Sequence, residues 1–88
     1  MYGLSSQIKR SAVSVPSNIS EGNARSGERE FAQFLNIAIG SLAELETQCL
    51  IAHRRKFINQ SNYDSLSDAI DEIFKMLNGL KNSLTSKL

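Results

Sequence analysis

Two long stretches of this 88-residue chain carry apolar side chains at a strict alternation of four and three residues. This heptad spacing keeps the apolar positions on one side of an α-helix, whereas a strand needs alternation at every second residue. The pattern therefore predicts two long helices that pack through facing seams. The seam positions are Phe31, Leu35, Ala38, Leu42, Leu45, Cys49 and Ala52 in the first stretch, and Tyr63, Leu66, Ile70, Ile73, Leu77, Leu80 and Leu84 in the second.

A shorter N-terminal stretch shows a similar helical periodicity. Pro16 interrupts it, because proline cannot donate a backbone hydrogen bond and its ring crowds the preceding turn. We expect a kink at this residue, with a break of the helix as the alternative. Gly22 and Asn23 then offer a C-terminal stop in the left-handed conformation. The apolar positions of this stretch are Leu4, Ile8, Ala12, Val15 and Ile19.

Length and charge distribution together predict the architecture. A chain of this size builds one core, so we expect a single all-α domain over residues 1–88. No charged residue occurs between Glu30 and Glu44, so the second helix should be central and touch more than one neighbour. Ser61 or Asn62 is the expected N-cap of the third helix. The predicted fold is an up-and-down antiparallel bundle of three long helices, over residues 4–22, 27–56 and 62–86.

A hairpin of the second and third helices would leave one side of the second helix bare, and the first helix, which is shorter and kinked, would cover only some of it. We therefore expect a further helix from another subunit to cover the rest. The second helix also has small side chains, Ala38, Gly40, Ser41 and Ala43, which would let another helix approach closely. The residues predicted to form the core or the oligomer seam are Phe31, Phe34, Leu35, Ala38, Leu42, Leu45, Ile70, Ile73, Leu77 and Leu80.

Several classes of function lack their residues in this sequence. His53 is the single histidine, and Leu50 stands where a Glu-x-x-His metal motif needs glutamate. Cys49 lies on the heptad seam, where a buried small hydrophobe is expected rather than a nucleophile. We therefore expect no catalysis, no metal, no cofactor and no small-molecule substrate. The N-terminus lacks a signal-peptide layout and no unbroken apolar run approaches about 18 residues, so we expect a cytoplasmic protein away from membranes.

The basic residues are the best functional candidates, although the formal net charge of only +1 gives no argument for nucleic acid by itself. The basic residues from His53 to Lys56 lie at the C-terminal end of the second predicted helix. Positive side chains there would interact favourably with the negative end of the helix dipole. For one chain alone this structural role is preferred. In an oligomer, several copies would add into a phosphate-binding surface. The candidate nucleic-acid contacts are Lys9, Arg10, Arg25, Arg29, Arg54, Arg55 and Lys56.

Ordered strings along most of the chain resemble a known family. These strings are Gln7–Ala12, Ser14–Gly22, Phe34–Ala38, Gly40–Thr47 and, more loosely, Met76–Leu80. They resemble the four-helix-bundle proteins encoded in intervening sequences of bacterial 23S rRNA genes. That family is similar in turn to the accessory protein of diversity-generating retroelements, a homopentamer that binds nucleic acid and a reverse transcriptase. Members carry a further helix before the counterpart of Tyr2-Gly3-Leu4, so we expect this chain to lack the first of four helices.

The resemblance implies a non-enzymatic helical homo-oligomer, a pentamer if it follows the accessory protein, that engages RNA or a ribonucleoprotein through basic patches. A second interpretation is a protein-interaction or assembly module without a nucleic-acid role, which the near-neutral net charge favours. The resemblance implies no catalytic residue at any position of this chain.

Overall fold

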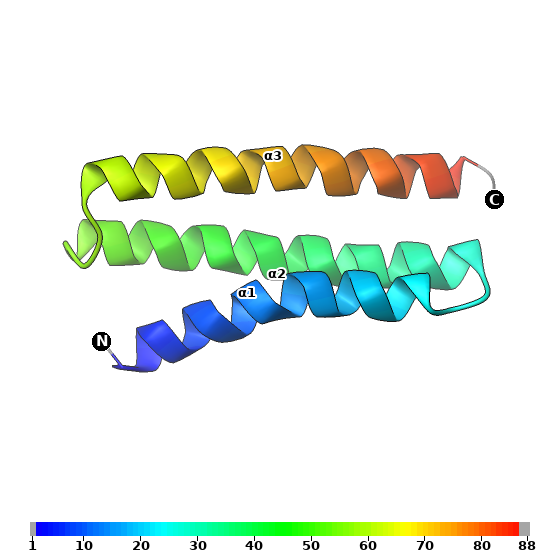
Figure 1. The fold of residues 1–88 in the computed structure, drawn as a ribbon, viewed down its shortest axis with the longest axis horizontal. Coiled ribbons are helices and arrows are strands. Elements are labelled where there is room, and N and C mark those ends of the chain that lie inside the picture. Colours follow the sequence, from blue (N-terminus) through cyan, green and yellow to red (C-terminus); the bar gives the residue numbers. More distant parts are fainter. Residues whose placement is uncertain (1, 87–88) are drawn as a thin grey trace.

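Three helices make up the computed structural model, which describes residues 2–86. They are α1 (Tyr2–Asn23), α2 (Glu28–Arg54) and α3 (Gln60–Thr85), and no strand occurs within those residues. Successive helices run in opposite directions and lie side by side along an axis of 45 Å (Figure 1). The helices begin and end within two residues of the ranges expected from the sequence.

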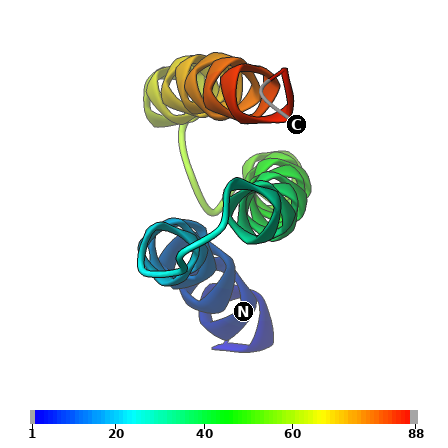
Figure 2. The ribbon, with the colours of Figure 1, turned by 90° about the vertical axis from the view of Figure 1, so that its right-hand side faces the viewer.

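The helix α2 lies between the other two. Both α1 and α3 pack against α2, whereas the backbones of α1 and α3 do not approach each other closely. Viewed along the helices, α1 and α3 extend from α2 in two different directions, and no helix lies diagonally opposite α2 (Figure 2). The described residues therefore form an open arrangement of three helices and do not by themselves close a bundle. The central place expected for the second helix is confirmed.

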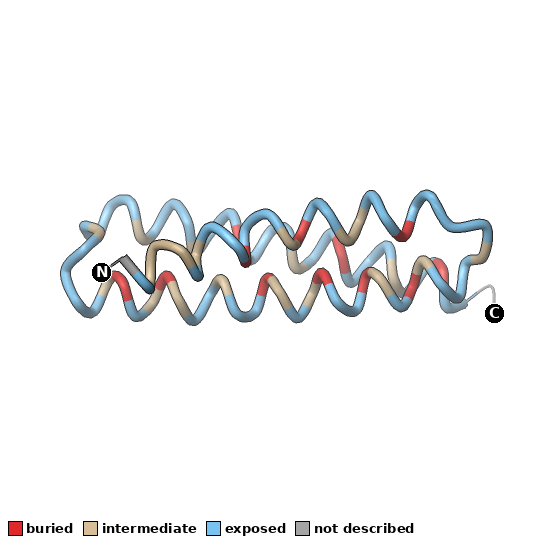
Figure 3. Tube along the Cα trace, turned by 90° about the horizontal axis from the view of Figure 1, so that it is seen from below, coloured by how far each residue is buried: buried red, intermediate tan, exposed pale blue. Residues whose placement is uncertain are grey.

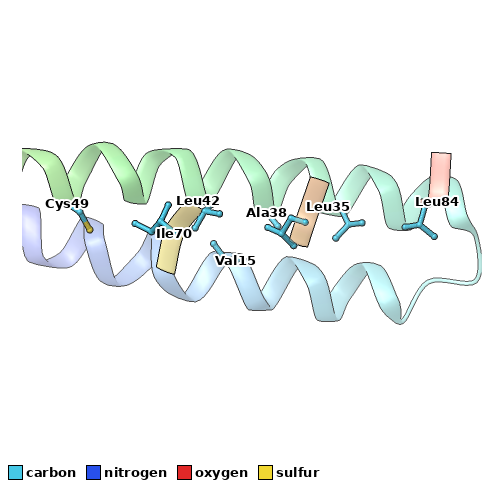
Figure 4. Packing of buried hydrophobic residues seen from close by; sticks show 8 residues of the cluster. Val15, Leu35, Ala38, Leu42, Cys49, Ile70 and Leu84 are labelled. Atoms are coloured by element: carbon cyan, nitrogen blue, oxygen red, sulfur yellow. The ribbon is translucent and has the colours of Figure 1, made fainter. Parts of the chain in front are cut away.

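The core lies along α2 and receives side chains from both neighbours (Figure 4). Leu35, Ala38 and Leu42 are at most 1% exposed. Val15 of α1 reaches the cluster from one side, and Ile70 of α3 reaches it from the other. Buried residues are few and spread along the length of the chain (Figure 3), as expected when each outer helix has only one neighbour.

The seam of α3 divides into two rows, each spaced by seven residues. Ile70, Leu77 and Leu84 are buried against α2, whereas Leu66, Ile73 and Leu80 remain exposed. Ile73 and Leu80, which were expected in the core or in the oligomer seam, are therefore not part of the core of this chain. The reason is that α3 packs against a single helix, and such a contact buries a narrow stripe rather than a full seam. On α2, three residues of the predicted core or oligomer set are half-buried, namely Phe31, Phe34 and Leu45.

The helices α1 and α2 approach each other closely at Gly22. A Cβ atom at this position would lie 2.7 Å from Cβ of Phe34 and 2.9 Å from Cδ1 of Phe31. Gly22 lies inside α1, and no glycine among the described residues has a positive φ. The helix ends at Asn23, as expected, but neither Gly22 nor Asn23 is left-handed, and Gly22 serves instead to let the two helices meet.

A small polar network joins the same two helices further along. The hydroxyls of Ser14 and Ser41 share a hydrogen bond of 2.7 Å between helices. The side-chain amide of Asn18 donates to the carbonyl oxygen of Ser14 and to its hydroxyl, at 2.8 and 3.0 Å. Of the small residues expected to admit a neighbour, Ser41 and Ala38 face α1 or the core, whereas Gly40 and Ala43 are exposed.

Two local expectations are resolved by the backbone. The helix α1 continues through Pro16, so the alternative of a break there is wrong. Figures 1 and 2 show that the N-terminal half of α1 departs from the line of its C-terminal half. The N-cap of α3 is Asn59, whose side-chain oxygen accepts from the backbone N–H of Asn62 at 2.7 Å. Ser61 and Asn62, the expected caps, lie inside the first turn instead.

The composition of α2 also meets the criterion for a membrane span. This 27-residue helix is long and apolar enough to cross a membrane, by length and composition alone, although no unbroken apolar run of that length exists. Core helices of soluble proteins meet the same criterion, and α2 packs against a helix on two sides. Only 22% of its most apolar stretch is buried within this chain, however. The single chain therefore leaves much of α2 without cover.

Gly22→Ala is expected to destabilise the fold by about 1–3 kcal/mol, because the added methyl group overlaps Phe34 and Phe31. Gly40→Ala is the matched control, since nothing lies within 4 Å of a Cβ atom at that position. Alanine favours a helix interior over glycine, so this control should stabilise the fold by about 0.5–1 kcal/mol. Urea unfolding followed by circular dichroism measures both. Equal effects of the two substitutions would show that Gly22 is not a packing constraint.

Candidate nucleic-acid interface

The connection between α2 and α3 begins with a left-handed residue. Lys56 has φ 62°, and it is the only non-glycine residue with positive φ in the described chain. Its N–H donates to the carbonyl oxygen of His53, and the N–H of Phe57 donates to that of Ala52, both at 2.9 Å. These paired bonds form a Schellman motif, in which glycine is the usual left-handed residue. A lysine here carries a conformational cost of about 1–2 kcal/mol.

His53 anchors this connection to the start of α3. Its ring stacks on Tyr63 with the centroids 4.4 Å apart and an interplanar angle of 10°. Its Nδ1 also lies 3.4 Å from the carbonyl oxygen of Ile58, a long hydrogen bond. His53 therefore holds the hairpin together and is half-buried, unlike the cations that follow it.

Four consecutive residues, Arg54, Arg55, Lys56 and Phe57, form what we call the basic tip. All three cations are exposed. No acidic side chain among residues 2–86 forms an ion pair with Arg54, Arg55 or Lys56. Phe57 is 44% exposed beside them. The tip thus combines positive charge with an accessible aromatic face, a pairing that suits a nucleic-acid strand.

The other candidate cations lie on α1 and around the connection between α1 and α2. Lys9 and Arg10 lie on the N-terminal half of α1, at the same end of the molecule as the tip (Figure 1). Arg10, however, lines a shallow depression together with Glu44 of α2. A nearby carboxylate weakens the attraction of Arg10 for phosphate.

Arg25 and Arg29 lie at the opposite end of the 45 Å long axis, around the connection between α1 and α2. Arg25 donates to Glu21 at 2.6 Å, and its guanidinium group lies 5.2 Å from the ring centroid of Phe34. These contacts give Arg25 a local structural role. The seven predicted cations are therefore divided between two ends of the molecule.

Phe57 was not identified as a functional candidate from the sequence. An aromatic residue that directly follows a basic run at a helix end is the signal that could have found it. Phe57 lies outside both heptad seams, so the spacing of apolar residues does not point to it.

Cys49 lies in the core of α2, as expected from its seam position. Burial raises the pKa of its thiol, because desolvation disfavours the thiolate. A protonated, buried thiol is a poor nucleophile at neutral pH. Among the described residues, no group of three or more His, Cys, Asp or Glu side chains is placed to hold a metal ion.

Comparison with known proteins adds the family. The model of the 23S rRNA-intervening sequence protein family matches residues 1–79, which is most of the chain. The chain belongs to this family. The resemblance to the 23S rRNA-intervening sequence proteins that the sequence strings indicated is therefore confirmed. Membership of this family does not specify an activity.

A solved structure shares the fold. It is a protein of unknown function from the S23 ribosomal protein family of Bacteroides thetaiotaomicron, with a TM-score of 0.87 and 30% sequence identity. The match covers 90% of this chain and 70% of that chain. Among curated proteins, none matches this chain.

Lys56→Gly is expected to stabilise the fold by about 0.5–1 kcal/mol, since relief of the left-handed backbone exceeds the added entropy of the unfolded chain. Arg55→Gly is the matched control, because Arg55 has φ −86° and gains no such relief. Thermal or urea unfolding of the two variants measures the difference. An Arg55→Gly variant as stable as Lys56→Gly would remove the argument from backbone strain.

Proposed function

We propose that this protein is a non-enzymatic, oligomeric helical protein that binds RNA, free or within a ribonucleoprotein, through its basic tip. The observation that carries this proposal is the exposed cluster of Arg54, Arg55 and Lys56, which no described acid neutralises. Lysine and arginine bind the phosphate backbone with little regard to sequence. A cytoplasmic location fits this role and belongs to the same proposal.

The left-handed backbone at Lys56 supports a functional reading of the tip. Glycine would satisfy the same hydrogen bonds at lower conformational cost. Side chains held in such unfavourable conformations cluster at functional sites. A lysine at this position keeps a third cation beside Arg54 and Arg55, so its cost to the fold is consistent with a benefit to binding.

Phe57 favours single-stranded RNA as the ligand. Proteins that bind single strands combine cations along the backbone with aromatic side chains on which bases stack. Bases within a duplex offer no free face to a surface phenylalanine. Stacking on one aromatic side chain contributes about 1–3 kcal/mol per base.

Association of several chains would strengthen this site. One tip offers three cations, and a protein with three phosphate contacts binds RNA weakly at physiological salt. Copies in an oligomer would pool their tips into a stronger field. The number of subunits, five if the chain follows the retroelement accessory protein, and the lack of a first helix both stay predictions.

A second candidate function is an assembly module without a nucleic-acid role. The exposed row formed by Leu66, Ile73 and Leu80 favours it, because a contiguous apolar surface marks a protein contact. Only a measurement of RNA binding distinguishes the two proposed functions, because both of them include association between proteins.

Arg54→Glu/Arg55→Glu is expected to weaken binding of a labelled single-stranded RNA by about a hundredfold, because two attractive contacts become repulsive. Arg25→Glu/Arg29→Glu makes the same change in net charge at the opposite end of the molecule and should alter binding less than about fivefold. Fluorescence anisotropy measures both. Greater loss in the second pair would move the binding surface to the other end of the molecule, and no binding by the parent protein would leave the assembly module.

The salt dependence of the same assay reports how many cations act together. For single strands, three phosphate contacts predict a loss of about twentyfold between roughly 50 and 200 mM salt. Pooling of two tips predicts a loss of several hundredfold over the same range. We expect the larger value, and a loss near twentyfold would show that each chain binds RNA by itself.

Lys56→Gly should reduce the affinity for RNA while it raises the stability of the fold, a combination that a purely structural lysine would not give.

A further inference from the structure

The helix α2 has a second face that neither α1 nor α3 covers. Exposed residues alternate there at three and four positions along nearly the whole helix, which is the spacing of a seam that has a partner helix. Between Phe31 and Ala43 this face carries no charge. Only 22% of the most apolar stretch of α2 is buried within this chain. We call the following exposed residues the outer face of α2: Glu30, Gln33, Ile37, Gly40, Glu44, Thr47, Ile51 and Arg54.

The outer face points away from the rest of the chain. Around the helix it lies opposite Leu35 and Leu42, which are buried in the core. Figure 2 shows that α1 and α3 both extend from the core side of α2 and that its other side is open. A second helix can therefore lie along the outer face without meeting α1 or α3 of the same chain.

A protruding side chain and a shallow depression both lie on this face. Ile37 is 52% exposed, more than any other large apolar side chain of α2. Two to three turns further along, a mostly apolar depression of about 330 Å³ offers room for an isoleucine side chain. Ile37 of the same chain is about 13 Å away along the helix and cannot reach it. The depression is lined by Ala43, Glu44, Thr47 and Gln48.

The ends of the outer face carry opposite charges. Glu30 lies in the first turn of α2, and Arg54 is its last residue. Neither side chain forms an ion pair within residues 2–86. Position 42 is midway between Glu30 and Arg54, and it is also midway between Ile37 and Thr47. A second α2 reversed about this point therefore brings both complementary pairs together at once.

We propose that the outer face of α2 binds the same face of a second copy, with the two α2 helices antiparallel about a two-fold axis at the level of position 42. Ile37 of each copy enters the depression at Thr47 of the other, and Glu30 of each copy lies beside Arg54 of the other. This inference deepens the oligomer of the proposed function and rests on it, because it names the face through which copies meet.

The packing leaves room for all six helices. The two-fold axis is perpendicular to the plane of the two α2 helices, so α1 and α3 of each copy stay beside or behind their own α2. With the α2 axes about 8–10 Å apart, the two α1 axes remain at least about 10 Å apart, and the two α3 axes are further apart. Gly40 allows the close approach of the α2 helices, since nothing lies within 4 Å of a Cβ atom at that position.

The contact area predicts a weak dimer. From Glu30 to Arg54 the outer face is about 36 Å long and about 10 Å wide, so the pair shares roughly 360 Å² per copy. Stable interfaces bury about 800 Å² per partner, and weak ones bury less than about 600 Å². We therefore expect a dissociation constant between roughly 10 µM and several hundred µM.

The pair leaves a basic tip at each end. Arg55 and Lys56 follow the outer face in sequence and are not part of it. The guanidinium group of Arg54 has five donors, of which a carboxylate engages two, so Arg54 can bind Glu30 of the other copy and still contact a phosphate. The two tips lie about 36 Å apart, and an RNA strand that spans the pair engages both. This arrangement supplies the pooling of tips that the proposed function requires.

Sedimentation equilibrium without RNA tests the face. The parent chain is expected to dimerise with concentration, and Ile37→Asn should raise the dissociation constant by about thirtyfold or more, since symmetry places a polar amide in both depressions. Ile73→Asn is the matched control, because it makes the same change at an exposed isoleucine of α3. It should alter the dissociation constant by less than about threefold. Circular dichroism checks that both variants fold.

A charge exchange tests the orientation. Glu30→Arg and Arg54→Glu should each weaken the dimer by about tenfold, because each makes two attractive contacts repulsive. The two substitutions together should restore the dissociation constant to within about threefold of the parent value. The two residues are about 36 Å apart in one chain, so such a rescue arises only between antiparallel copies. A double variant weaker than either single variant would overturn the orientation.

Glu44 provides a test by gain of association. The two Glu44 side chains lie on either side of the two-fold axis, within about 10 Å of each other, and repel. Glu44→Gln should therefore lower the dissociation constant by about three- to tenfold. Glu46→Gln removes the same charge away from the outer face and should leave the dissociation constant unchanged. Equal effects of the two substitutions would contradict the proposed packing.

The outcomes separate this inference from the proposed function. A parent chain that stays monomeric at about 1 mM overturns the inference and leaves RNA binding by single chains. Association that is lost in Ile73→Asn but kept in Ile37→Asn also overturns it and moves the contact to α3. A dimer that binds no RNA supports the inference and overturns the RNA-binding function. Ile37→Asn keeps the net charge, so it should retain RNA binding at low salt while its salt dependence falls to that of a single tip.

Discussion

Burial of α2 from two directions at once is the constraint on which the rest of the molecule depends. Leu35, Ala38 and Leu42 lose nearly all contact with water because α1 and α3 pack against α2 from two different directions. One neighbour would cover only a stripe of α2, as the exposed row on α3 demonstrates. The approach of α1 depends in turn on the absence of a side chain at Gly22. With α2 held in this way, the hairpin that follows it places the basic tip at one end of the molecule, and α3 presents its unused row on the open side.

The sequence predicted the helices and the central place of α2 because both follow from local spacing and charge, which a single chain displays in full. It did not predict which row of the α3 seam would be buried, since Ile73 and Ile70 are equally apolar and only the number of neighbouring helices separates them. The N-cap of α3 was misplaced because Asn59, Ser61 and Asn62 are all capping residues, and the first of them took the position. The packing role of Gly22 was not predicted for a different reason. A close contact between two helices cannot be read from the spacing of apolar residues along one helix.

The candidate site shows the same division between local and spatial information. The basic run at Arg54 to Lys56 is visible in the sequence, but its freedom from acidic partners is a property of the fold. The sequence grouped Arg25 and Arg29 with these residues by charge, whereas the fold sets them at the other end of a 45 Å axis. The left-handed backbone of Lys56 is likewise a consequence of how α2 ends. Because lysine is an uncommon choice at such a position, only the structure reveals it as a point of strain.

The lack of a close backbone approach between α1 and α3 has a consequence for how the chain folds. Each helix packs mainly against its neighbour in sequence, so the energetics of the chain resemble those of a short solenoid more than those of a closed globule. Contacts between sequence neighbours close short loops, which favours rapid folding. Detachment of α1 would uncover part of the core of α2 but would leave the interface between α2 and α3 in place. Its amide hydrogens should therefore exchange in two classes rather than one, with those of α1 less protected.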